Sequence, residues 1–172
     1  FGEGYHSTGH VYSHTFTTPG VHAYLCSPHP SSMYGAITVN EATQSFNPGD
    51  VIITEIMQNP SGVSDNYGEW FEVFNTTMSA IDLNGWIIRD QPGSSQNVAN
   101  ITSSVIVPPL GHITLGRGGV TDPTSPEFNG GVNHQFIYDF GFLLANSSDE
   151  VILESPNGIV IDEVYYDNGS TY

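Results

Sequence analysis

The sequence predicts an all-β protein built from sandwich-type sheets. Three observations favour this fold class. Apolar residues recur in short runs with the two-residue alternation of strands, turn residues separate these runs, and no segment shows a helical period. The 172 residues are 38% hydrophobic and 12% aromatic, which is sufficient for a core, and the 19 glycines and 11 prolines provide many turns.

The first part of the chain, residues 1–40, contains three predicted strands. They are residues 13–16, 21–25 and 36–39, and Thr18-Pro19-Gly20 forms the turn between the first two. Three strands are too few for an independent sandwich. Residues 41–50 are polar and include the turn Pro48-Gly49, so we interpret them as a linker.

The second part, residues 51–172, contains many short strands with regular turns, which is typical of a β-sandwich. In residues 69–75 the alternation places Trp70, Glu72 and Phe74 on one face and Phe71 and Val73 on the other. The predicted strands are residues 51–57, 69–75, 86–90, 105–107, 112–115, 135–138, 150–153 and 160–164.

The charge balance excludes two classes of partner. The chain has 18 acidic residues and two basic ones, Arg89 and Arg117, which gives a net charge of −16. Binding to nucleic acid requires lysine or arginine to neutralise phosphates, and docking on an anionic membrane requires the same residues. We therefore expect neither partner.

The remaining surface is rich in uncharged polar residues, and this composition favours an extracellular or cell-surface location. Four Asn-x-Ser/Thr motifs, at Asn75, Asn100, Asn146 and Asn168, are candidate glycosylation sites. The single cysteine excludes a disulfide within the chain.

The second part resembles the lamin tail domain, an immunoglobulin-like β-sandwich, over about residues 50–167. The resemblance implies binding or scaffolding rather than catalysis, so we expect no enzyme. In the family a further strand usually follows, and we expect this sandwich to lack it. The matching stretches are 53–56 with Asn59-Pro60, 68–75, 82–90, 142–146, 149–153 and 158–166.

The first part resembles the C-terminal half of a cupredoxin, the family of plastocyanin-like blue-copper proteins. The resemblance rests on residues 13–16, 19–24 and 35–39 and on the loop that contains Cys26, His29 and Met33. Thiolate, imidazole and thioether groups are ligands that select copper. The resemblance implies that Cys26 and His29 are equatorial ligands and that Met33 is a long axial ligand.

A blue-copper site needs a second histidine, which in the family comes from a strand well upstream. Here only 25 residues precede Cys26, and His14 and His22 align with positions that are not ligands. His6, His10, a partner chain or upstream strands of a longer protein, of which this chain would be a fragment, therefore remain as sources, and copper binding depends on one of them. Alternatively, Cys26 is a small buried hydrophobe and Met33 fills a core.

Two other sites were weighed from the acidic residues of the second part. Calcium could lie between acidic turns such as residues 147–150, although the spacing of an EF-hand loop is absent. Glu55, Glu69, Glu72, Asp82 and Asp90 invite a carboxylate-site hypothesis, but no recognisable supporting residues accompany them.

Two functional hypotheses follow from these observations. The first is a secreted or cell-surface protein in which the cupredoxin part binds copper for electron transfer or metal handling and the sandwich mediates attachment. The second is a structural subunit of an extracellular layer, filament or adhesin without copper, which contacts other subunits or surface components. Homo-assembly by strand addition is the mechanism we expect for the second hypothesis.

Overall fold

The structure is a computed structural model of the chain, and it describes residues 11, 13–26, 28–40, 44–93, 97–119, 124–125, 128–138 and 140–168. The chain divides into two compact units, residues 1–45 and residues 46–172. Within the described ranges, no helix is long and apolar enough to cross a membrane.

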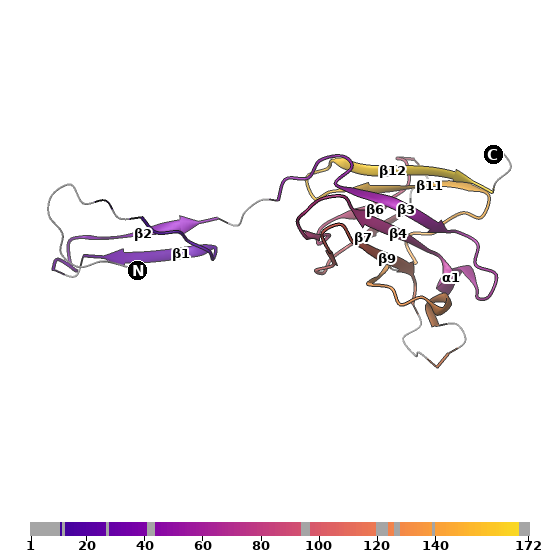
Figure 1. The fold of residues 1–172 in the computed structure, drawn as a ribbon, viewed down its shortest axis with the longest axis horizontal. Coiled ribbons are helices and arrows are strands. Elements are labelled where there is room, and N and C mark those ends of the chain that lie inside the picture. Colours follow the sequence, from indigo (N-terminus) through magenta and orange to yellow (C-terminus); the bar gives the residue numbers. More distant parts are fainter. Residues whose placement is uncertain are drawn as a thin grey trace. The chain divides into compact units, whose positions relative to one another are not determined.

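The first unit contains one antiparallel hairpin, β1 (Gly20–Leu25) and β2 (Tyr34–Val39), shown in Figure 1. The predicted strand at residues 13–16 is wrong, because this segment is irregular. A segment becomes a strand only through a ladder of hydrogen bonds, and β1 and β2 pair only with each other here. Instead, the Phe16 ring lies 4.8 Å from the His14 ring and 4.7 Å from the His22 ring.

The described part of the first unit contains no buried residue. Val21 and Tyr34 are each 71% exposed, and Leu25 is 61% exposed. A two-stranded hairpin with its apolar side chains in water has little independent stability. The hairpin therefore presents an uncovered apolar surface.

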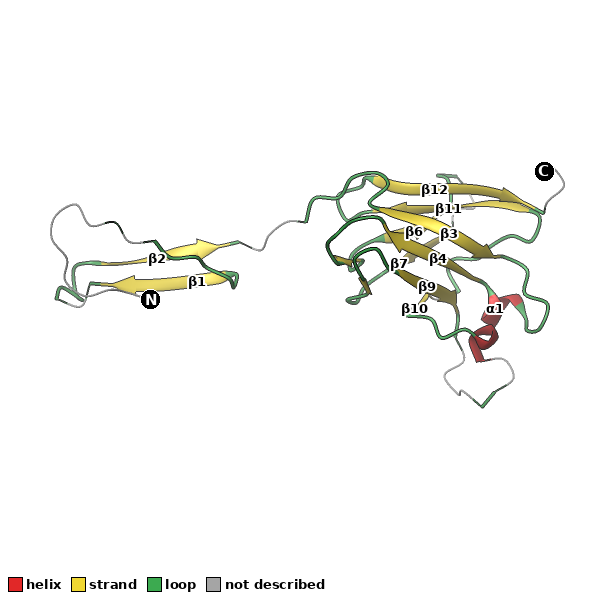
Figure 2. Ribbon diagram, viewed as in Figure 1, coloured by secondary structure: helices red, strands yellow, loops and turns green. Residues whose placement is uncertain are grey.

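The second unit is a β-sandwich of two four-stranded sheets (Figures 1 and 2). One sheet has the order β10-β9-β4-β3 and the other has the order β12-β11-β6-β7, while β5 and β8 form a small third sheet. Only the β9–β10 pair is parallel among the described strand pairs. The elements are β3 (Val51–Met57), α1 (Asp65–Gly68), β4 (Trp70–Asn75), β5 (Ile81–Asp82), β6 (Ile87–Arg89), β7 (Val98–Asn100), β8 (Ile106–Val107), β9 (His112–Arg117), η1 (Phe128–Gly131), β10 (Phe136–Tyr138), β11 (Ser148–Glu154) and β12 (Val160–Asp167).

The all-β prediction is confirmed, and the longer predicted strands correspond to β3, β4, β9, β11 and β12. Three short elements are not predicted from the sequence: β5 and β7, which have two and three residues, and the one-turn helix α1. Elements of this length carry too few residues for a recognisable period.

The core lies between the two sheets, and the alternation of β4 points into it. Phe71 and Val73 are fully buried, whereas Trp70, Glu72 and Phe74 are half-buried on the other face, as predicted. Trp86 is also fully buried, and the Phe46 ring meets it edge-on at 5.0 Å. Phe46 thus joins the core where the chain enters the second unit.

The long edge strands β3 and β12 close against each other. The Gly49 amide donates to the Ile161 carbonyl at 2.7 Å, and the Ile53 amide donates to Asp162 Oδ2 at 2.7 Å. A register shift between Ile53 and Glu55 bends β3 at this point. The two hydrogen bonds occupy the Gly49 and Ile53 amides, which at an open sheet edge would be available to a strand from another chain.

We predict that Asp162→Ala lowers the free energy of unfolding by about 1–2 kcal/mol, because it leaves the part-buried Ile53 amide without an acceptor. Glu163→Ala, at the adjacent exposed position of β12, is the matched control and should change it by no more than about 0.5 kcal/mol. Denaturant unfolding and hydrogen exchange at Ile53 measure both effects. Equal free energies of unfolding for the two variants would contradict a stabilising role of the Ile53–Asp162 hydrogen bond between β3 and β12.

Candidate functional site

The loop between β1 and β2 holds the three predicted copper ligands. Cys26 follows β1 and Met33 precedes β2, and the hairpin register brings them opposite each other. The Cys26 amide donates to the Met33 carbonyl at 2.8 Å, the His29 amide donates to the Cys26 carbonyl at 3.0 Å, and the Met33 amide donates to the His29 carbonyl at 2.9 Å. The backbone therefore fixes the positions of all three residues.

The side chains of Cys26 and His29 meet at this loop. Cys26 Sγ lies 3.7 Å from His29 Nδ1. Met33 is 55% exposed and lines the same surface hollow as Cys26, together with Tyr24, Leu25 and Tyr34. The donor set of thiol, imidazole and thioether fits copper in chemical type.

The ligand set is incomplete within the described ranges. No group of three His, Cys, Asp or Glu side chains there is arranged to hold a metal ion. His22 Nε2 lies 2.9 Å from the Thr18 carbonyl oxygen, and the Phe16 ring contacts both the His14 ring and the His22 ring. His6 and His10 lie outside the described residues.

Asn75 requires a correction, because it is not an exposed glycosylation site in this fold. Its side chain is fully buried. Its amide nitrogen donates to the Ser79 carbonyl at 2.8 Å and to the Val107 carbonyl at 3.1 Å, and its oxygen accepts from the Thr77 amide and hydroxyl. A sugar on this nitrogen would break these contacts. The other candidates, Asn100, Asn146 and Asn168, are exposed.

The acidic turn that was weighed for calcium uses its carboxylates internally. Asp149 Oδ2 accepts from the Ala145 amide at 2.8 Å, and Glu150 Oε1 accepts from the Gln91 amide at 2.7 Å. These bonds hold two loops in place. They give the two side chains a structural role.

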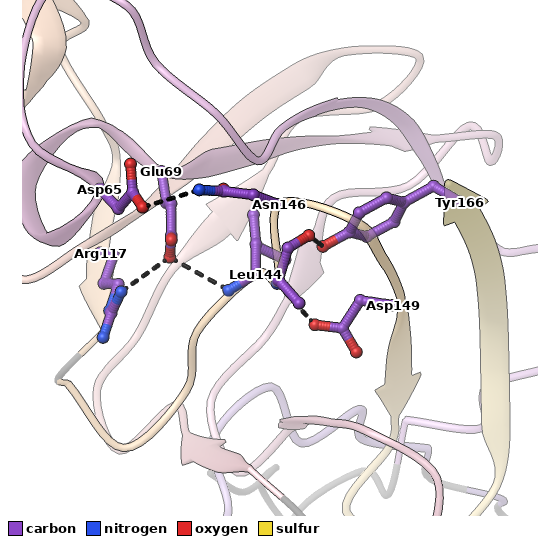
Figure 3. A network of polar contacts seen from close by, with 8 residues as sticks. Asp65, Glu69, Arg117, Leu144, Asn146, Asp149 and Tyr166 are labelled. Carbon is purple, nitrogen blue, oxygen red and sulfur yellow. Dashed lines mark hydrogen bonds and ion pairs between the residues drawn. The ribbon is translucent and has the colours of Figure 1, made fainter. Parts of the chain in front are cut away.

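A buried ion pair between Glu69 and Arg117 connects parts of the sandwich that are distant in sequence, and Figure 3 shows its surroundings. Glu69 Oε2 accepts from Arg117 Nη1 at 3.0 Å and from the Leu144 amide at 3.1 Å. Beside it, Asn146 donates to Asp65 at 3.1 Å. The sequence marks Glu69 as one of several acidic residues, but it does not reveal its pairing with Arg117, which lies 48 residues further along the chain.

The neighbouring loop is also held from β12. The Tyr166 hydroxyl donates to the Ala145 carbonyl at 3.0 Å (Figure 3). Burial raises the pKa of Tyr166, and the nearby Asp149 and Glu69 carboxylates raise it further. Tyr166 therefore stays a neutral donor at physiological pH.

Burial also governs the ionisation of Glu69, whose side chain is 2% exposed. Burial raises the pKa of the Glu69 carboxyl above its ordinary value, although the Leu144 amide and the Arg117 guanidinium oppose this shift. The guanidinium thus limits the cost of keeping a carboxylate in the interior.

Both basic residues of the chain are engaged inside the second unit. Arg117 pairs with Glu69, and Arg89 Nε donates to Glu154 at 2.8 Å. The chain has no other lysine or arginine, so these residue types form no cationic patch on its surface. That nucleic acid and anionic membranes are not partners stays a prediction.

The fold of the second unit defines a β-sandwich protein of the immunoglobulin-like class. The family model of the lamin tail domain matches residues 44–168, and the chain belongs to that family. The family model of copper binding proteins, the plastocyanin/azurin family, matches residues 3–40. Both predicted resemblances are confirmed, in the predicted order. The comparison with curated proteins gives no match.

We predict that Arg117→Met lowers the free energy of unfolding at pH 7 by about 3 kcal/mol, because Glu69 is then buried without its counter-charge. Losing the guanidinium raises the pKa of Glu69 further. The stability contributed by a protonated Glu69 is present at acidic pH and is lost as pH rises through this pKa, so the deficit of the variant should shrink as pH falls.

Arg89→Met is the matched control, because the Arg89–Glu154 pair is more exposed, with side-chain exposures of 15% and 20%. It should cost about 1 kcal/mol. The double variant Glu69→Gln/Arg117→Met should regain most of the lost stability at pH 7. Denaturant unfolding at several pH values measures these effects, and a deficit of Arg117→Met that is independent of pH would contradict the prediction.

Proposed function

We propose that this chain is a secreted or cell-surface protein without enzymatic activity, in which the cupredoxin-like part binds one copper ion and the lamin tail domain mediates attachment. The observation that carries the copper proposal is the approach of Cys26 Sγ to His29 Nδ1, at 3.7 Å, in a loop fixed by the hairpin. The match of residues 3–40 to copper binding proteins supports it.

Three side chains of this loop would hold the ion. Cys26 and His29 would supply the thiolate and the imidazole, and Met33 would supply the thioether. The fourth ligand would be a histidine at His6, at His10, on a partner chain or in a segment upstream of these residues. A bound copper ion would supply one-electron chemistry between Cu(I) and Cu(II), which suits electron transfer or metal handling.

The surface supports the extracellular location. The net charge is −16, and the candidate acceptors Asn100, Asn146 and Asn168 are exposed. Uncharged polar residues cover much of the remaining surface. The partners we propose are other protein subunits or components of a cell surface.

The alternative function is a copper-free structural subunit that assembles by strand addition, and one observation favours the hairpin as the place of addition. In the sandwich, β3 and β12 satisfy each other at one edge. In the first unit, β1 and β2 each have one side unpaired among the described strands. An added strand would continue this small sheet.

We predict that the full chain titrated with Cu(II) shows an intense thiolate-to-copper absorption band and one bound copper by native mass spectrometry. Cys26→Ser should abolish the band, and His29→Asn should weaken copper binding at least about tenfold through the loss of a ligand. His112→Asn, at an exposed histidine of β9, should change neither measurement.

His6→Asn and His10→Asn locate the fourth ligand. If neither variant changes copper binding, the histidine lies outside these two positions, on a partner chain or in a segment upstream of the given sequence. A wild-type chain that stays colourless and binds no copper would reject the copper proposal. Concentration-dependent association of such a chain, measured by sedimentation, would favour the structural alternative.

A further inference from the structure

Two uncharged loop segments meet at one end of the sandwich: residues 76–80, and residues 105–111, which include the two-residue strand β8. The Leu110 amide donates to the Thr77 carbonyl at 3.1 Å, and the Asn75 amide donates to the Gly111 carbonyl at 3.0 Å. The buried Asn75 side chain also bonds to the carbonyls of Ser79 and Val107. We call these two segments the apolar tip. The buried Asn75 side chain connects them through these hydrogen bonds.

Leu110 occupies a position of the apolar tip that the backbone disfavours for leucine. Residues 108–111 form a turn in which the Gly111 amide donates to the Pro108 carbonyl at 3.0 Å. Leu110, the third residue of this turn, has a φ of 50°, a conformation for which turns usually employ glycine. The leucine side chain is also 53% exposed. The fold thus gains little from a side chain that strains its backbone.

Other exposed apolar side chains accompany Leu110. Met78 is 80% exposed and Ile106 is 50% exposed. Neither loop contains an acidic or basic residue, although the whole chain carries a net charge of −16. The Asp82 carboxylate accepts from the Val105 amide at 2.9 Å beside Ile106, so the uncharged part of the apolar tip is its outer end with Met78 and Leu110.

Charge and size indicate what the apolar tip contacts. A stable protein interface buries about 800 Å² on each partner, which is more than a few side chains of two short loops can supply. A second copy would also bring a second charge of −16. A bilayer accepts apolar side chains without matching their shape, and headgroups without net charge do not repel the protein.

We propose that the apolar tip inserts Leu110 and Met78 into the interfacial region of a zwitterionic phospholipid bilayer. This inference rests on the attachment role proposed for the lamin tail domain and specifies its chemical partner. The absence of unpaired cations at the tip sets the preference for lipids without net charge.

Flotation of the full chain with phosphatidylcholine vesicles tests this proposal. We expect the wild-type chain to float with the vesicles, and Leu110→Gly to partition about tenfold more weakly, because burial of a leucine side chain is lost. Its midpoint of thermal unfolding should be unchanged or higher, since glycine relieves the strained turn. Met78→Ser should also weaken binding.

Leu143→Ser is the matched control, because Leu143 is also exposed but lies away from the apolar tip. The next residue, Leu144, bonds to Glu69, which precedes β4, whereas Asn75 ends that strand. It should bind like the wild type. Added phosphatidylserine should weaken wild-type binding, because the protein is acidic. Equal binding by Leu110→Gly and the wild type, or binding that requires phosphatidylserine, would overturn the proposal.

A second experiment distinguishes the bilayer proposal from the broader proposal of attachment. It measures whether the wild-type chain binds to the surface of cells that produce it. If the chain binds these cells but not phosphatidylcholine vesicles, attachment stands and the bilayer is rejected. If it binds neither, both are rejected. Cys26→Ser should float like the wild type, since the copper loop belongs to the other unit.

Discussion

The buried pair of Glu69 and Arg117 is the interaction on which the arrangement of the sandwich depends. Glu69 precedes β4 and Arg117 ends β9 in one sheet, while the Leu144 amide that shares the carboxylate lies on the loop leading to β11 in the other. One side chain thereby fixes the approach of the two sheets. Because a lone buried carboxylate is costly, any change that displaces Arg117 also disturbs the loop at Leu144.

The same pair also shapes the outer surface. An acidic chain with only two arginines uses both of them in ion pairs with its own carboxylates, the buried Glu69 and the partly exposed Glu154. Its surface therefore carries acidic and uncharged groups without compensating cations. Because each arginine is engaged in an ion pair within the protein, neither is free to bind an anionic partner. The same two ion pairs therefore stabilise the fold and restrict which partners the protein can bind.

Sequence reasoning succeeded where the determining residues are neighbours in the chain. The alternation of β3 and β4 and the close spacing of Cys26, His29 and Met33 are local, and both predicted family resemblances are confirmed. It failed where the outcome depends on distant residues. Residues 13–16 have strand composition but join no sheet, and β5 and β7 exist only through pairing with β8 and β6. Asn75 lies in a glycosylation motif, but its side chain is buried and bonds to the Val107 carbonyl.

The entry of the chain into the second unit has a mechanical consequence. Immediately after the unit begins, the Phe46 ring packs on Trp86, and the Gly49 amide bonds to Ile161 on β12. A pull on the first unit therefore loads these two contacts before it reaches β3. The Phe46–Trp86 contact and the Gly49–Ile161 hydrogen bond then resist the force before β3 separates from its sheet. The sandwich can therefore stay folded while a force acts on its N-terminal segment.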